Sequence, residues 1–238
     1  MEEPSTIQVN FGKPFPLFPL DGVALMPHSV LRLFIFEPRY RQMVEDVLEG
    51  TGQIAMAIHR GDPHDSEIDP VPIRPAVCVG QIVRYERLPD GTYHLWLQGV
   101  CRAQVVQEDP PDEVRLYRQA ILRPLEPGEI DESILAPHRA KLSKLLDSAP
   151  LNELPRVRFI INELNERATM PTHALLEAVT LAVIPMLGDN SLQYRLLEEG
   201  DARLRASIIE HELGVLNRLL RKVGTQYDPD APKGVSWN

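Results

Sequence analysis

The spacing of the apolar residues changes once along the chain, and this change restricts the possible folds more than any other feature. Up to about residue 125, apolar residues alternate in short runs between Pro-rich turns; after about residue 130 they recur every three or four residues. The connecting sequence RPLEPGEID contains two prolines and a glycine, which interrupt both strands and helices. We therefore predict an α+β protein. The predicted boundaries are residues 12–125 for a strand subdomain, 130–224 for a helical bundle, and 1–11 and 225–238 for flexible tails.

The sequence LRLFIFEPRY, residues 31–40, contains a predicted junction between a strand and a helix. Leucine and isoleucine alternate there with Arg32, Phe34 and Phe36, as in a strand with two different faces. Pro38 has no amide hydrogen and suits the first helical turn, so we predict that the strand ends and a helix begins there. Arg39 lies off the apolar stripe of this helix and is available to solvent or a contact. We expect the two phenylalanines to pack against the helical half, and the pattern does not decide which of them is exposed.

A β-hairpin is predicted around Pro89-Asp90-Gly91. A three-residue loop with Gly91 in the left-handed conformation places apolar residues on one face, whereas a two-residue loop mixes polar with apolar on both faces. In this register Arg84 and Trp96 are exposed. The predicted pairs are Tyr85 with Leu95 and Val83 with Leu97 on the buried face, and Arg84 with Trp96 and Glu86 with His94 on the exposed face.

The common catalytic motifs are missing from the sequence. It contains no GxxxxGK[ST] phosphate loop, no GxGxxG dinucleotide fingerprint and no GxSxG nucleophile turn. His211-Glu212 begins an HExxH pattern, but Val215 stands where the second zinc-binding histidine would be needed. We therefore predict no intrinsic ATPase or peptidase activity and no cofactor.

Two further features could bind a metal ion or carry out chemistry, and we interpret both as structural. The acidic stretch DPHDSEID, residues 62–69, offers carboxylates and an imidazole for a cation but lacks the glycine and spacing of a calcium loop. We interpret it as a solvated loop, and whether it binds a cation stays open. Cys78 and Cys101 lie in strand-like segments without a CxxC partner, which favours reduced thiols over a zinc site, a disulfide or a nucleophilic Cys/His pair.

The charge and the apolar runs indicate what the protein does not bind. A formal net charge of −9 argues against nucleic-acid and anionic-membrane partners, because such binding neutralises phosphates with clustered Lys and Arg. The acidic, polar start MEEPSTIQVN does not resemble a secretory signal. The longest apolar run, residues 174–187, is interrupted by Glu177 and is too short to span a bilayer. We expect a soluble cytoplasmic protein.

Two stretches of the chain resemble a known family. FPLFPLDGVALMPHSVLRLFIFEPRYRQMV, residues 15–44, and VGQIVRYERLPDGTYHLWLQGVCRAQVV, residues 79–106, are similar to the N-terminal substrate-binding domain of Lon proteases. The helical half is similar as well, in EAV, IPM and LQYRLLEEGDARLR, but less specifically. The resemblance covers residues 12–220 and is to free-standing bacterial members without ATPase or protease domains. It implies a PUA-like β-barrel with one packed helix, followed by a helical bundle.

The resemblance also implies a function. The family's domain engages unfolded or damaged polypeptide, so we expect a non-enzymatic polypeptide-binding module, an adaptor in protein quality control with an ATP-dependent protease as partner. The candidate contact residues are Trp96, Arg84, Arg39, Phe34 and Phe36. Two alternatives stay open: RNA or nucleotide binding through the PUA-like barrel, and a hydrolase outside the known motifs.

Overall fold

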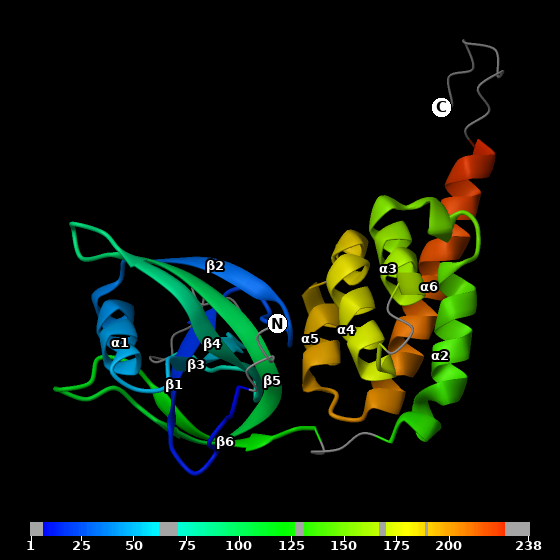
Figure 1. Ribbon diagram of the computed structural model, residues 1–238. Coiled ribbons are helices and arrows are strands. Elements are labelled where there is room, and N and C mark those ends of the chain that lie inside the picture. The colour runs from blue at the N-terminus through cyan, green and yellow to red at the C-terminus, as the bar shows by residue number, and fades with distance from the viewer. Residues whose placement is uncertain (1–6, 62–70, 127–130, 167–169, 189, 227–238) are drawn as a thin grey trace. The chain divides into compact units, whose positions relative to one another are not determined.

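The computed structural model describes residues 7–61, 71–126, 131–166, 170–188 and 190–226 (Figure 1). The strands are β1 (Phe15–Leu20), β2 (Val30–Ile35), β3 (Gln53–Ile58), β4 (Ala76–Arg87), β5 (Tyr93–Asp109) and β6 (Gln119–Pro124). The α-helices are α1 (Pro38–Leu48), α2 (Glu132–Leu146), α3 (Pro155–Glu166), α4 (Thr172–Ala182), α5 (Asn190–Glu198) and α6 (Ala202–Gln226). Two 3₁₀ helices are η1 (Leu151–Glu153) and η2 (Ile184–Leu187). The predicted α+β class is confirmed.

The strands form one mixed sheet that closes on itself. The order is β2-β5-β4-β3-β1-β6, and an additional pairing of β5 with β6 completes a ring of hydrogen bonds. Only β1 and β3 run parallel among these described pairs. The long strand β5 pairs with β2 through residues 93–98 and with β6 through residues 103–109. The ring corresponds to the barrel that the resemblance implies, and β2 extends the sheet beside it as an edge strand.

The interior of the ring is filled with apolar residues of different sizes. Its buried members are Phe15, Leu17, Ala55, Ala57, Ile73, Val77, Val79, Ala103, Ala120 and Leu122. The N-terminal segment contributes to this core, because Val9 and Phe11 pack against it and the Gln8 carbonyl accepts a hydrogen bond of 2.8 Å from Gln53 Nε2. Residues 7–11, part of the stretch predicted as a flexible tail, thus have contacts with the strand unit.

Helix α1 begins at Pro38, as predicted. Glu37 precedes it in an extended conformation, and the buried side chains of α1 include Tyr40, Met43 and Val44. The ring of Tyr40 meets Phe18 of β1 edge to face, with ring centroids 4.6 Å apart. The apolar stripe of α1 is thereby fixed against the sheet.

The chain divides into two compact units, and the division differs from the predicted one. The strand unit contains residues 1–130 and 188–202, and the helical unit contains 131–187 and 203–238. Helix α5 belongs to the strand unit, because the Tyr194 hydroxyl accepts a hydrogen bond of 3.0 Å from the Ala76 amide in β4. The Arg102 guanidinium of β5, which is 1% exposed, donates to the Leu196 carbonyl across 3.1 Å.

The helical unit contains α2, α3, α4 and α6, in agreement with the predicted bundle. Asp131 caps α2 by accepting a hydrogen bond of 2.9 Å from the Ser133 amide. Buried Glu210 on α6 accepts from Nδ1 of His138 at 2.8 Å and from Nζ of Lys141 at 2.6 Å, both on α2. These charged hydrogen bonds fix α6 against α2. The predicted tail at 225–238 starts inside α6, and its residues 227–238 lie outside the described part.

Candidate functional site

The loop of the predicted hairpin has the expected geometry. The Gly91 amide donates to the Leu88 carbonyl and the Leu88 amide donates to the Thr92 carbonyl, both across 2.9 Å. Gly91 has φ 81°, a conformation that glycine adopts at little cost. Asp90 accepts hydrogen bonds from the amide and hydroxyl of Thr92, which lower the pKa of Asp90. The three-residue loop Pro89-Asp90-Gly91 is therefore confirmed.

The strands of the hairpin agree with the prediction in three pairs and differ in one. The pairs Arg84 with Trp96, Tyr85 with Leu95 and Glu86 with His94 are confirmed. The pair Val83 with Leu97 is wrong: Ile82 lies opposite Leu97, and a register shift between Ile82 and Arg84 leaves Val83 in a bulge.

Tyr85 is 53% exposed, so its predicted burial is also wrong. Strand β3 pairs with β4 only as far as Gln81. The end of β4 beyond this residue therefore has a neighbouring strand on one side only, whereas Leu95 lies between β2 and β4 and is buried.

Trp96 lies between two arginines on the outer side of the sheet. Strand β2 places Arg32 opposite Trp96 on one side, and β4 places Arg84 opposite it on the other. The guanidinium carbons of Arg32 and Arg84 are 5.9 and 4.6 Å from the ring centroid of Trp96. Each such cation–π contact contributes about 0.5–1 kcal/mol at an exposed site. Trp96 is therefore half-buried and held in place, rather than fully exposed as the hairpin register predicted.

Arg32, Trp96 and Arg84 form one row of side chains across the three strands. A second row lies beside it and includes an exposed aromatic pair. Phe34 lies opposite His94 on β5, which in turn lies opposite Glu86 on β4. Phe34 and Phe36 are 51% and 60% exposed, and their rings stack with centroids 5.9 Å apart. The strand unit itself therefore leaves both phenylalanines exposed. We call the two rows the aromatic face, which consists of Arg32, Phe34, Phe36, Arg84, His94 and Trp96.

Arg39 has contacts at a different place in the strand unit. Its guanidinium forms an ion pair with Glu37 at 2.7 Å and stacks on Tyr40 with its central carbon 4.5 Å from the ring centroid. It lines a cavity of about 460 Å³ together with Tyr40, His59 and Arg118. Among the contacts of the described residues, none joins Arg39 to the aromatic face. The structure thus brings together four of the five predicted contact residues.

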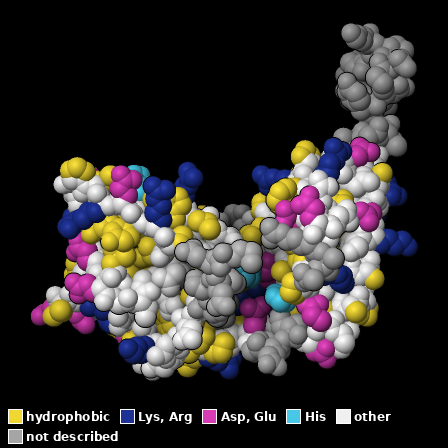
Figure 2. Space-filling view, in the orientation of Figure 1, with side chains coloured by type: hydrophobic (Ala, Val, Ile, Leu, Met, Phe, Trp, Pro, Cys, Tyr) yellow, Lys and Arg dark blue, Asp and Glu magenta, His cyan; other side chains and the backbone are white. Residues whose placement is uncertain are grey.

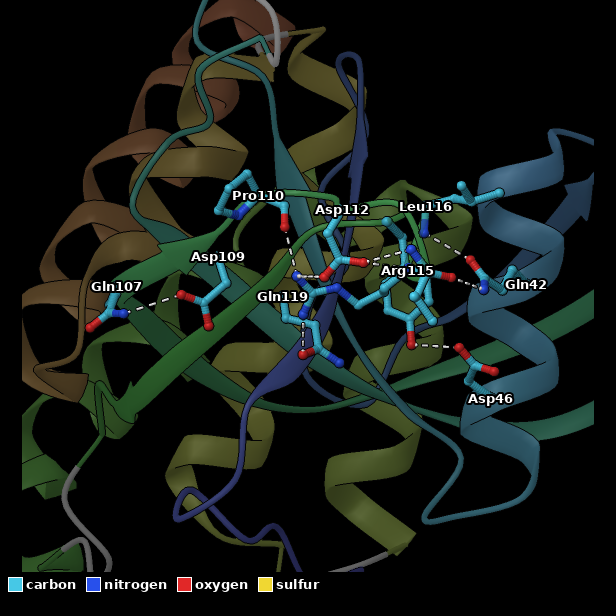
Figure 3. A network of polar contacts seen from close by, with 11 residues as sticks. Gln42, Asp46, Gln107, Asp109, Pro110, Asp112, Arg115, Leu116 and Gln119 are labelled. Carbon is cyan, nitrogen blue, oxygen red and sulfur yellow. Dashed lines mark hydrogen bonds and ion pairs between the residues drawn. The ribbon is translucent and has the colours of Figure 1, made fainter.

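An ordered loop beside α1 is a feature that the sequence analysis missed (Figure 3). The Gln42 side chain on α1 donates to the Val114 carbonyl at 2.7 Å and accepts from the Leu116 amide at 2.8 Å. Asp112 accepts hydrogen bonds from the amides of Arg115 and Val114, and these bonds lower the pKa of Asp112. Val114 is 82% exposed at the tip of this loop. The local sequence signal for this turn is Asp112 directly after Pro110-Pro111, because Asp side chains often accept a hydrogen bond from the backbone two residues further on.

Two signs of chemistry are missing from the described residues: a reactive thiol at Cys101 and a group of metal-binding side chains. Burial, with the Glu126 carboxylate nearby, raises the pKa of Cys101 to about 11, so this thiol is protonated at neutral pH and a poor nucleophile. Within the described ranges no three His, Cys, Asp or Glu side chains are grouped to hold a metal ion. The acidic stretch at residues 62–69 lies outside these ranges. The helices of the described part include none long and apolar enough to cross a membrane.

Solved structures identify the class of this fold. The N-terminal domain of the Mycobacterium avium complex Lon protease superposes with a TM-score of 0.63 at 17% sequence identity. A Lon N-terminal domain protein from Xanthomonas campestris superposes with a TM-score of 0.58 at 20% identity. Each comparison covers 85% of this chain and 98% of the other chain. The fold is that of a Lon N-terminal domain.

The sequence comparisons identify the family. The chain belongs to the substrate-binding domain family of the ATP-dependent protease La (Lon), whose family model matches residues 14–213. It is 28% identical to the Lon protease of Azorhizobium caulinodans over 159 residues, and 24% identical to that of Rhizobium meliloti over 217 residues. These matches cover 66% and 88% of this chain but only 18% and 26% of the relatives. The predicted resemblance is confirmed, and it supports a role in substrate recognition.

Proposed function

We propose that this chain recognises unfolded or damaged polypeptide through the aromatic face, without catalysing a reaction itself. Membership of the Lon substrate-binding domain family supports a substrate-recognition role. The observation that carries the proposal is the exposed, stacked pair Phe34 and Phe36 beside Trp96, which Arg32 and Arg84 hold in place. Aromatic and arginine side chains are the residues that most often dominate the binding energy of an interface.

The aromatic face suits an unfolded partner better than a folded one. Unfolded chains expose the apolar side chains that folded proteins bury, and covering the two phenylalanines with such side chains removes apolar area from water. Each square ångström of apolar area removed from water contributes about 25 cal/mol. The face lies on paired strands, so binding orders few additional residues of this chain.

The second part of the proposal concerns the partner that receives the polypeptide. The relatives are Lon proteases, and this chain corresponds to about a quarter or less of their length. We propose that it acts as an adaptor, delivering bound polypeptide to an ATP-dependent protease and requiring no cofactor of its own.

The negative net charge of the protein argues against RNA binding through the strand unit. The chain carries a formal net charge of −9, and on the face seen in Figure 2 the Lys and Arg side chains are interspersed with acidic and hydrophobic ones. RNA binding requires clustered positive charge to neutralise phosphates and falls steeply with added salt.

Fluorescence anisotropy with a permanently unfolded probe tests the proposal. The probe is a labelled, reduced and alkylated protein, and its native disulfide-bonded form is the control. We expect binding of the unfolded form only, weakened about tenfold or more by Phe36→Ala. Phe159→Ala is the matched control, because Phe159 on α3 is 65% exposed and lies outside the strand unit. Equal binding of both probe forms, equal losses in the two variants, or tighter and salt-dependent binding of RNA would each contradict the proposal.

A further inference from the structure

Strand β2 is an edge strand with one set of backbone groups directed away from the sheet. In the described part of the chain it stands at the end of the strand order and pairs only with β5, over Val30–Ile35. The Gly99 amide on β5 donates to the Ser29 carbonyl, just before β2. In an antiparallel pair every second residue is hydrogen-bonded to the partner strand, so the residues of β2 that bond to β5 are Leu31, Leu33 and Ile35. The backbone groups of the residues between them face outward. Among the described residues, no backbone group bonds to this outer edge.

The side chains of β2 are also incompletely covered on both sides of the sheet. On the inner side Ile35 is buried, but Leu31 and Leu33 remain half-exposed at the edge. On the outer side Val30 and Phe34 are each 51% exposed. One further strand placed along β2 would cover apolar side chains on both sides and would satisfy the outward backbone groups.

Arg32 opposes the pairing of β2 with a second copy of itself. An antiparallel pairing of two β2 edges that matches Val30 with Phe34 places Arg32 directly opposite Arg32, and like charges in that position destabilise a sheet. The described residues include no carboxylate paired with Arg32, whose guanidinium lies over the Trp96 ring. The edge therefore favours a partner strand that carries a carboxylate at this position.

We propose that β2 takes up an extended segment of the bound polypeptide as an additional antiparallel strand, with an acidic residue opposite Arg32 and apolar residues opposite Val30 and Phe34. This inference rests on the proposed function and specifies the substrate class of the same site. The preferred segment has the pattern apolar–x–acidic–x–apolar. The six residues of β2 match a segment of about 20 Å at about 3.3 Å per residue.

Labelled peptides with backbone methylation test the strand addition directly. The probe is a peptide containing Ile-Thr-Asp-Thr-Phe, in which the Ile, Asp and Phe amides would donate to β2 and the two Thr amides would point away. N-methylation of the Asp amide should weaken binding about tenfold or more, because it removes a donor and blocks the edge. N-methylation of a Thr amide should leave affinity within about twofold. Equal effects of methylation at the two kinds of position, or a larger effect at Thr, overturn the inference.

A charge exchange tests the register without changing the backbone. Arg32→Glu should weaken binding of the Asp peptide about tenfold or more. The same variant should regain binding to a peptide in which Lys replaces Asp. Arg158→Glu is the matched control, because Arg158 is exposed on α3 in the helical unit. Circular dichroism of each variant establishes that it is folded.

The outcomes separate this inference from the proposed function. Absence of binding to both the peptides and the unfolded protein probe overturns the proposed function. Binding that Phe36→Ala weakens but backbone methylation does not affect supports side-chain recognition and overturns strand addition alone. Sedimentation tests whether a second copy of the chain occupies the edge. A dimer that is disrupted by substitutions at Val30, with Arg32 left unchanged, would identify a second copy as the occupant and would also overturn the inference.

Discussion

The hydroxyl of Tyr117 donates a hydrogen bond of 2.8 Å to Oδ2 of Asp46, so the segment that leads into β6 is joined to helix α1. Burial, followed by this hydrogen bond, raises the pKa of Tyr117 to about 12. The ordinary pKa of tyrosine is about 10. The pKa of Tyr117 is thus higher in the folded state than in the unfolded state. The protonated hydroxyl therefore contributes its full stabilisation of the fold at pH values below the ordinary pKa, and this contribution is lost as the pH rises towards the raised pKa.

Tyr117→Phe therefore has two expected effects, which urea unfolding at a series of pH values measures. At neutral pH the variant should be less stable by about 1 kcal/mol, since one hydrogen bond is lost and the exposed Asp46 is rehydrated. Between the ordinary and raised pKa values, the wild-type protein should lose more stability than the variant. Parallel pH profiles for the two proteins would contradict the assignment.

Gln42→Ala should release the loop that Figure 3 shows beside α1. The Gln42 amide group makes two hydrogen bonds to the loop backbone, at Val114 and Leu116. Their loss should increase amide hydrogen exchange at Leu116 and lower global stability by about 1–2 kcal/mol. Gln107→Ala is the control, because the Gln107 side chain donates a hydrogen bond to the nearby Asp109 side chain and its loss should not affect the Leu116 amide. Unchanged exchange at Leu116 in Gln42→Ala would show that the loop is held by other contacts.

Gly99→Ala should destabilise the strand unit strongly. A Cβ at this position would lie 2.1 Å from the carbonyl oxygen of Met26, a backbone atom that cannot move without disturbing the start of β2. We expect a loss of about 3 kcal/mol or more in chemical unfolding, at the upper end of overpacking effects. Gly50→Ala provides the comparison, since its Cβ would meet the nearest atom at 3.7 Å and its φ is not in the left-handed region. Similar stabilities of the two variants would contradict the close approach at Gly99.

Trp96→Ala should reduce both stability and binding. The half-buried ring supports Arg32 and Arg84, so its removal should lower the free energy of unfolding by about 1–3 kcal/mol. Affinity for the unfolded probe, expressed per folded molecule, should fall about tenfold or more. Calorimetry and anisotropy on the same samples separate the two effects. A loss of stability with unchanged affinity would make Trp96 a structural residue only.

The features of the fold that were predictable from the sequence depend on neighbouring residues. Pro38 determines where α1 begins, and Gly91 determines the loop of the hairpin, because each acts through its own backbone conformation. The placement of α5 was not predictable in this way. It depends on Tyr194 and Arg102 meeting elements distant in sequence, and the apolar pattern of α5 resembles that of the neighbouring helices.

The candidate site was predictable only in part for the same reason. The pairing of Arg84 with Trp96 was predictable, because one short loop joins the two strands and determines their register. Arg32 was not identified, because its position depends on the pairing of β2 with β5, strands separated by several other elements. The bulge at Val83 and the exposure of Tyr85 depend on where β3 ends, which the local alternation of residues does not encode.

The docking of α5 on the strands has a consequence for the order of events during translation. The Ala76 amide and the Tyr194 hydroxyl that it contacts are 118 residues apart, and α2, α3 and α4 lie between them in the chain. On the ribosome, all six strands therefore emerge before the helix that completes their covering. With chain elongation at about 5–20 residues per second, the sheet, complete at Pro124, waits roughly 3–13 seconds for α5 to begin at Asn190. During that interval the nascent strand unit exposes to solvent the surface that α5 later occupies, including the Ala76 amide and the Arg102 guanidinium.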